Sequence, residues 1–251
     1  MPSITASFRT PAIFTRCAGV SAAESTRIGG FSRPPYDTLN LGLYTADDPE
    51  AVKRNRSDFF QALGFSEDRA AGAHQVHGDR IKVVEAPGQS EGYDALITDR
   101  AGILLTITVA DCAPVLLLDP VRGAIGAAHA GWRGTVAGIA AKTLGKMGEV
   151  FRTRPEDCLV YIGTCIDVCC FEVGDEVAAQ FTDQQRKWNE RTGKYHVDNK
   201  AALRDQLMEA GVLPRNLEIS PYCTFDQPDC FSHRRDRGLT GRMLGVIGMR
   251  G

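Results

Sequence analysis

The sequence has little net charge and no long apolar run. Its 29 basic and 31 acidic residues leave a formal charge of −2, which gives no strong field to attract nucleic acid or an acidic membrane surface. The most apolar internal run, 103–110, is far shorter than the roughly 20 residues that a membrane-spanning helix needs. We therefore expect neither a nucleic-acid nor a membrane partner.

The first twenty residues lack a long apolar core after a basic start, so they do not resemble a secretory signal peptide. In a protein that is not exported, the eight cysteines should be mostly reduced thiols, available as core residues, nucleophiles or metal ligands. An apolar share of 43% is ordinary for a globular protein with a core. These features favour a cytoplasmic protein, and the absence of repeats and linkers favours one domain.

Apolar spacing predicts helices and strands that alternate along the chain. Helices are expected over about 49–63, from the turn 131–135 through Met147, from 171–174 to Phe181, and over about 199–210. Strands are expected at 81–84, within the long apolar segment 103–118, and at 124–128, 158–162 and 217–220. The pattern predicts an α/β (α+β) fold over residues 1–251, a single domain of mixed β-sheets flanked by helices.

The turn 119–123 joins two apolar strands and predicts a β-hairpin. If the turn centres near Pro120 or Val121, paired residue numbers sum to about 241 or 242, so Cys112 faces His129 or Ala130. Opposed residues in such a ladder have Cα atoms roughly 4.5–5.5 Å apart. A thiolate and an imidazole at that spacing can share a metal ion, since zinc binds sulfur at about 2.3 Å and nitrogen at about 2.0–2.1 Å.

A third ligand would complete an open zinc site. His77, in a glycine-bounded loop before a strand, is the best candidate, which gives the ligand set His77, Cys112 and His129. Three protein ligands leave one coordination position for water, which zinc makes nucleophilic near neutral pH. Asp111 could orient a ligand or transfer a proton, so we expect Asp111, Cys112 and His129 to take part in catalysis.

The same residues allow other interpretations. Cys112 could be a small core residue and both histidines structural side chains, each fully hydrogen-bonded. Cys112 could instead be a nucleophile with His129 as its base. A third alternative is a non-catalytic zinc-binding module with four protein ligands.

The turn 131–135 opens a predicted helix, so its free backbone N–H groups can hold an anion such as phosphate, with charge added by Arg133. An ordinary helix start is an equal alternative. Trp132 can stack on a base or simply pack. We expect Arg133 to assist catalysis and the following residues to bind substrate: Gln75, Gly131, Trp132 and Gly134.

Other polar clusters receive a structural interpretation. The run 232–236 could place cations near a substrate, but it is more typical of a solvated, salt-bridged loop. The zinc-deaminase signature H-x-E with P-C-x-x-C is absent. Five further cysteines lack the C-x-x-C spacing of a structural zinc site and are interpreted as core or loop thiols: Cys165, Cys169, Cys170, Cys223 and Cys230.

Three ordered motifs, HQVHG at 74–78, ADCAPVLL at 110–117 and HAGWRG at 129–134, resemble the YfiH family, also called the multicopper polyphenol oxidoreductase or laccase-domain family. The resemblance covers nearly the whole chain, through further motifs at 40–42, 94–98, 170–174, 231–236 and 240–242. It implies a single YfiH-like α/β domain and a zinc site at His77, Cys112 and His129.

The resemblance implies a zinc-dependent purine nucleoside enzyme, because family members are described as combining phosphorolysis of adenosine, inosine, guanosine or methylthioadenosine with adenosine deamination. Purine nucleoside and phosphate would be the small-molecule substrates; no oligomeric state is implied. Members are also described as laccases, but five histidines are too few for a multicopper set. The alternative is a cysteine amidohydrolase using Cys112 and His129, as in the family branch described as a peptidoglycan-precursor editing factor.

Overall fold

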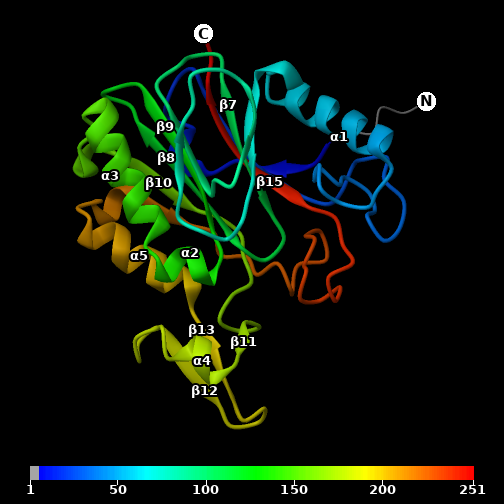
Figure 1. The fold of residues 1–251 in the computed structure, drawn as a ribbon, viewed down its shortest axis with the longest axis vertical. Helices are drawn as coiled ribbons and strands as arrows, with labels where there is room; N and C mark the ends of the chain where they lie inside the picture. The colour runs from blue at the N-terminus through cyan, green and yellow to red at the C-terminus, as the bar shows by residue number, and fades with distance from the viewer. Residues whose placement is uncertain (1–5) are drawn as a thin grey trace.

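The computed structural model describes residues 6–251, so the first five residues of the predicted domain lie outside the described part. The fold of those described residues is α+β, as predicted, with two six-stranded mixed sheets and a small three-stranded antiparallel sheet (Figure 1). Within residues 6–251, no helix has both the length and the apolar character needed to cross a membrane.

The first large sheet combines three strands from the two ends of the chain with three strands from residues 70–109. Its C-terminal strand lies antiparallel between an N-terminal strand and a central one. In spatial order the strands are β1 (Phe8–Arg9), β2 (Val20–Ser25), β15 (Met243–Met249), β7 (Leu104–Val109), β3 (Ala70–His74) and β5 (Gly88–Glu91).

The second large sheet contains the predicted hairpin at its centre. Its two hairpin strands are buried along their whole length, which explains why they read as continuous apolar runs. In spatial order the strands are β14 (Leu217–Ile219), β10 (Leu159–Ile162), β8 (Ala113–Asp119), β9 (Ala124–Ala130), β6 (Ala95–Thr98) and β4 (Ile81–Val83).

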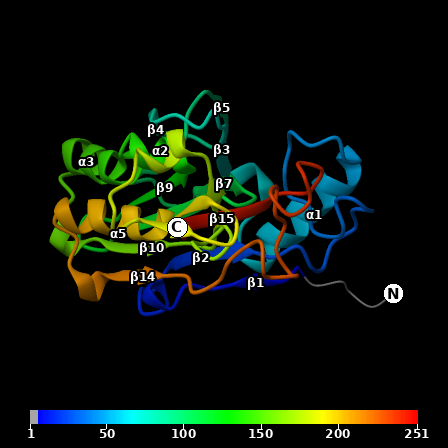
Figure 2. The same cartoon turned by 90° about the horizontal axis from the view of Figure 1, so that it is seen from below.

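The two large sheets pack face to face, and helices cover their outer faces. Between the sheets, Leu105 and Ile247 of the first share one core with Leu116 and Ile125 of the second. Helix α1 (Pro49–Ala62) packs on the first sheet, whereas α3 (Ile139–Phe151) and α5 (Asn199–Glu209) pack on the second, on the opposite side of the sandwich (Figures 1 and 2). Short 3₁₀ turns lie at η1 (Ala12–Phe14), η2 (Glu67–Arg69), η3 (Pro155–Asp157) and η4 (Pro214–Asn216).

Helices α1 and α5 lie where the sequence predicts them because their start signals are local. The Asp48 carboxylate accepts a hydrogen bond from the backbone N–H of Glu50, and Pro49 occupies the first turn. Gly64 follows the end of α1 in a left-handed conformation with φ of +80°. At the start of α5, the Asp198 carboxylate accepts from the N–H of Ala201.

The helix predicted from 131–135 through Met147 is two helices, so that prediction was wrong. A five-residue α2 (Trp132–Val136) ends before Gly138, whose φ of +77° breaks the helical path, and α3 begins at Ile139. Apolar spacing misses this break because glycine does not disturb the pattern of its neighbours. The turn 131–135 therefore opens a single helical turn rather than a long helix.

The helix predicted to reach Phe181 is also much shorter than expected. Its apolar residues, including Val177 and Phe181, pack into the core of a small lobe instead of extending a helix. This lobe, at the bottom of Figure 1, contains α4 (Asp175–Ala178) and the sheet β11 (Glu172–Val173), β13 (Lys194–Val197) and β12 (Arg186–Asn189).

The hairpin exists, but its predicted register was wrong. Asp119 pairs with Ala124, and Pro114 with His129, so paired numbers sum to 243 rather than 241 or 242. The turn is shifted because the Asp119 carboxylate accepts hydrogen bonds from the N–H groups of Val121 and Arg122 and closes a four-residue loop. Cys112 consequently precedes β8 and does not face His129 across the ladder.

The packing of Leu116 gives a stability prediction. Leu116 is 0% exposed in the core between the two large sheets. We expect Leu116→Ala to lower the free energy of unfolding by about 2–5 kcal/mol, because it leaves a cavity between rigid sheets. Urea unfolding measures the loss. Val121→Ala, in the hairpin turn and 65% exposed, is the control and should change stability by less than about 0.5 kcal/mol; equal losses in both variants would contradict the packing described here.

Candidate metal centre

Two chain segments cross from one large sheet to the other at the same end of the sandwich. The segment 75–80 leaves β3 of the first sheet and enters β4 of the second, and 110–112 joins β7 to β8 in the same way. His77 and Asp111 adopt left-handed conformations in these crossings, with φ of 59° and 88°. Because β3 and β7 are parallel neighbours, both crossings lie side by side.

These crossings bring the three predicted ligands together. His77 lies in the first crossing, Cys112 ends the second, and His129 lies near the end of β9. One ligand atom from each lies within 4.8 Å of the others, and the two imidazole rings are 4.8 Å apart at an interplanar angle of 76°. His129 is buried, Cys112 is half-buried and His77 is exposed. The three residues can hold a metal ion with one side open to solvent.

Asp94, which sequence reasoning did not single out, fixes both histidines. One of its carboxylate oxygens, Oδ1, lies 2.9 Å from His129 Nδ1 and accepts a hydrogen bond of 2.9 Å from the backbone N–H of His77. The other accepts from the N–H groups of Gly78 and Val76, at 2.8 and 3.2 Å. A carboxylate that holds Nδ1 of a histidine leaves Nε2 free for a metal, which is the usual outer support of a histidine ligand.

Gly131 leaves the space that the ligand set needs. A Cβ atom at this position would lie 2.9 Å from Cys112 Sγ and 3.3 Å from His77 Cδ2, so any larger residue would push the ligands apart. The first distance is shorter than real Cβ contacts allow. Gly131 therefore leaves room for Cys112 and His77 to approach each other, and the donor set fits a bound metal ion.

The electrostatics of the ligand set favour a charged pair in the metal-free protein. Burial raises the pKa of the Cys112 thiol, but the charge of His129 and hydrogen bonds with His129 and His77 outweigh burial and bring this pKa down to about 6. Burial lowers the pKa of His129, but Cys112 and Asp94 reverse the effect and raise it to about 9. At neutral pH the pair is a thiolate and an imidazolium, and a metal ion would replace the imidazolium proton.

A cavity of about 420 Å³ opens above the three ligands. Of the other predicted site residues, Gln75 and Asp111 line it. The Gln75 amide is tied to the backbone of Thr108 by two hydrogen bonds of 2.8 Å. The Asp111 carboxylate accepts from Thr224 Oγ1 at 2.6 Å and from the backbone N–H of Arg234 at 2.7 Å. Both side chains thus fasten the cavity wall.

The remaining predicted residues of 131–134 are not among those that line this cavity. The Arg133 guanidinium stacks over the Trp132 ring, 4.3 Å from its centroid, and Trp132 packs against the core of the small lobe. Gly134 is buried, and a Cβ there would lie 3.2 Å from the carbonyl oxygen of Gly78. The predicted substrate contacts of Trp132, Arg133 and Gly134 are therefore not seen in this cavity.

The C-terminal segment supplies three cavity residues, two of which belong to the run 232–236 that sequence reasoning interpreted as a solvated loop. His233, Arg234 and Arg242 all line the cavity. Arg234 also reaches the carbonyl of Glu172, and Arg242 those of Thr240 and Gly241. In the sequence, the family motifs at 231–236 and 240–242 were the available indication that these residues line the cavity, because the charge of a loop does not determine its position. The full lining is Gly42, Tyr44, Ala73, His74, Gln75, His77, Thr108, Ala110, Asp111, Cys112, His129, Ile166, Phe171, His233, Arg234 and Arg242.

Comparisons with known proteins agree over most of the chain. Residues 21–250 match the family model described as multi-copper polyphenol oxidoreductase laccase. A purine nucleoside phosphorylase of Deinococcus radiodurans is 45% identical over 92% of this chain and 89% of its own, and purine nucleoside phosphorylase YlmD of Geobacillus stearothermophilus is 39% identical over 93% and 91%. The crystal structure of Bacillus licheniformis YfiH is 34% identical, covers 97% of this chain and 99% of its own, and superposes with a TM-score of 0.90.

The depressed pKa of Cys112 predicts unusual thiol reactivity in metal-free protein. Because the thiolate is the reactive form, alkylation of Cys112 should rise with pH through about 6. Iodoacetamide labelling followed by peptide mass spectrometry measures the profile. His129→Gln removes the positive charge that stabilises the Cys112 thiolate, so the midpoint of the labelling profile should move to higher pH. A wild-type midpoint near the ordinary thiol value of about 8.5 would refute the charged pair.

The contacts of Asp94 predict its effect on the ligands. If His77, Cys112 and His129 hold a metal ion, Asp94→Asn should weaken the binding of added divalent metal by about 10- to 100-fold, because the support of His129 and of the His77 loop is lost. Competition with a chromogenic chelator measures the change. Asp99→Asn, at the exposed far end of β6, is the matched control. Unchanged affinity in Asp94→Asn would show that Asp94 does not hold the ligands.

Proposed function

Because the chain belongs to the multicopper polyphenol oxidoreductase laccase family, which includes the YfiH and YlmD proteins, we propose that it is a zinc-dependent purine nucleoside phosphorylase that also deaminates adenosine. The observation that carries the proposal is the arrangement of His77, Cys112 and His129 at the base of a cavity that arginines line. The relatives named above as purine nucleoside phosphorylases support the substrate class.

The donor set supports zinc over copper oxidase chemistry. Two imidazoles and one thiolate with an open side suit a catalytic zinc ion. The sequence has five histidines, and among the described residues only His77 and His129 belong to this ligand group. When bound, zinc would supply a Lewis acid and a positive charge at the base of the cavity.

The cavity walls suit a nucleoside and a phosphate. Its volume of about 420 Å³ lies in the range of small-molecule sites. The rings of Tyr44 and His74 lie 4.6 Å apart on the wall, tilted by 52°, and either ring can pack against a purine. Arg234 and Arg242 offer charges that can pair with phosphate oxygens.

In phosphorolysis, a phosphate oxygen bonds to the anomeric carbon of the ribose, the bond from that carbon to the purine nitrogen breaks, and the base leaves with a proton. We propose that Arg234 and Arg242 hold the phosphate in place for this attack. Asp111 would act as a positioning residue, because its carboxylate accepts from the backbone N–H of Arg234. In deamination, water adds at the carbon that bears the amino group and ammonia leaves, without phosphate.

A cysteine amidohydrolase is the second candidate, and one observation favours it. In metal-free protein, the Cys112 thiol is hydrogen-bonded to His129, and His129 is hydrogen-bonded to Asp94. The three residues can thus serve as nucleophile, base and orienting carboxylate. This geometry is that of a cysteine hydrolase. It requires a free thiolate, so bound metal and this chemistry exclude each other.

The test incubates zinc-loaded protein with adenosine and phosphate in one reaction, and with adenosine alone in another. We expect adenine and ribose 1-phosphate in the first case and inosine in the second. Cys112→Ala should abolish phosphorolysis and deamination, and chelation should reduce both activities, since each treatment removes the metal. Cys17→Ala, in a loop outside the cavity, is the control and should retain activity.

Absence of all three products from zinc-loaded protein would refute the proposed function. Substrate turnover that survives chelation and leaves a covalent adduct on Cys112 would instead support the amidohydrolase.

A further inference from the structure

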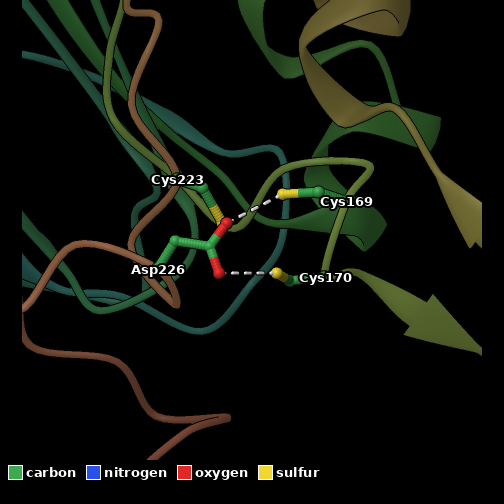
Figure 3. A group of neighbouring side chains, drawn as sticks. All are labelled: Cys169, Cys170, Cys223 and Asp226. Atoms are coloured by element: carbon green, nitrogen blue, oxygen red, sulfur yellow. Dashed lines mark hydrogen bonds between the residues drawn. The ribbon is translucent and has the colours of Figure 1, made fainter.

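A second cluster of metal-binding side chains lies between two loops outside the ligand set described above. It consists of Cys169 and Cys170 from one loop and Cys223 and Asp226 from another, and Figure 3 shows the four side chains converging. One ligand atom from each lies within 4.8 Å of the others. We propose that these residues form a closed structural site for zinc or a similar thiol-binding divalent cation.

The donor atoms suit such an ion in type, number and spacing. Zinc bound tetrahedrally to three sulfurs at about 2.3 Å and one oxygen at about 2.0 Å places its ligand atoms roughly 3.5–3.8 Å apart, within the 4.8 Å that these donors span. In the metal-free protein the thiols of Cys169 and Cys170 donate hydrogen bonds to the two carboxylate oxygens of Asp226, at 3.3 and 3.2 Å, so the carboxylate already faces both sulfurs. Three sulfurs and a carboxylate fill all four positions, which is typical of a structural site rather than a catalytic one.

The two loops are held together by contacts that do not involve the four donors' ligand atoms. The backbone N–H of Thr224 donates to the carbonyl of Cys165 at 3.0 Å. The buried Lys200 ammonium joins the loops, at 2.7 Å from the Asp167 carboxylate and 2.8 Å from the carbonyl of Tyr222. The donors are therefore brought close by the fold, and little further closure is needed to bind an ion.

The surroundings of Cys223 fit a thiolate ligand. Its sulfur accepts a hydrogen bond of 3.4 Å from the backbone N–H of Asp167, the kind of outer contact that supports a metal-bound sulfur. Cys223 is buried, whereas Cys169 and Asp226 are exposed. The site thus has a fixed buried base and a path by which an ion can enter from solvent.

A metal ion in this cluster would fasten the wall of the active cavity. Cys170 directly precedes Phe171, which lines the cavity. Cys223 directly precedes Thr224, whose hydroxyl donates to Asp111 on the same wall. Joining these loops would hold both wall residues in place.

Zinc titration of reduced, metal-free protein tests the proposal. We expect two equivalents per chain in the wild type and one in Cys112→Ala, which loses the first site. In the Cys112→Ala background, adding Cys169→Ser or Asp226→Asn should remove the remaining tight equivalent. Both residues are exposed, so the substitutions should not prevent folding. Cys17→Ser in the same background removes a thiol elsewhere and should keep the equivalent.

Cobalt distinguishes the ligands directly. Tetrahedral cobalt bound to thiolates gives intense sulfur-to-metal absorption, which Cys112→Ala should retain and the added Cys169→Ser should lose. If the wild type binds one equivalent that disappears in Cys169→Ser but not in Cys112→Ala, the second site stands and the first fails. Two results overturn the proposal. One is a Cys112→Ala protein that binds no zinc tightly. The other is a Cys112→Ala protein whose zinc stoichiometry and cobalt spectrum do not change when Cys169→Ser or Asp226→Asn is added.

Discussion

The arrangement of the candidate metal ligands depends on the buried carboxylate of Asp94. The residue is 0% exposed, and an unpaired carboxylate there would cost several kcal/mol. Burial raises its pKa, but the hydrogen bonds from His129 and the backbone N–H of Gly78 outweigh burial and lower it. The charge is satisfied only when the loop of His77 folds over it and His129 turns toward it. Local folding of the loop and orientation of both ligands are therefore one event.

The sandwich explains why the ligands meet where they do. A chain that passes from one packed sheet to another must turn at the sheet edge, and both crossings here turn at one end of the sandwich. The left-handed residues His77 and Asp111 make these turns sharp, so that His77 and Cys112 point to the end of β9. Strain in such residues is tolerated where surrounding contacts fix the backbone, as Asp94 does for His77.

Sequence patterns predicted what local chemistry determines. Apolar spacing predicted α1 and α5, whose starts the carboxylates of Asp48 and Asp198 fix locally, and the turn residues predicted the hairpin of β8 and β9. The predicted hairpin register was wrong because two hydrogen bonds from backbone N–H groups to the Asp119 carboxylate decide it, and the predicted long helix was wrong because Gly138 breaks it. His77 and Cys112 come together because the two sheets pack on each other, and no local sequence pattern predicts that packing. The prediction of His77 therefore rested mainly on the family resemblance and on the need for a third ligand.

The same limit applies to the second cysteine cluster, and its position relates the two centres. Cys169 and Cys223 are too far apart in sequence to show a metal-binding spacing, so only the fold reveals the cluster. Asp111 connects the two clusters. It precedes Cys112 in sequence, and its carboxylate accepts a hydrogen bond from the hydroxyl of Thr224, which follows Cys223. An open three-ligand site needs a rigid wall to hold substrate against it, whereas a closed four-ligand site can provide rigidity but no chemistry. The two donor sets suit these two roles, and the short chain of contacts through Asp111 is the physical route by which one can support the other.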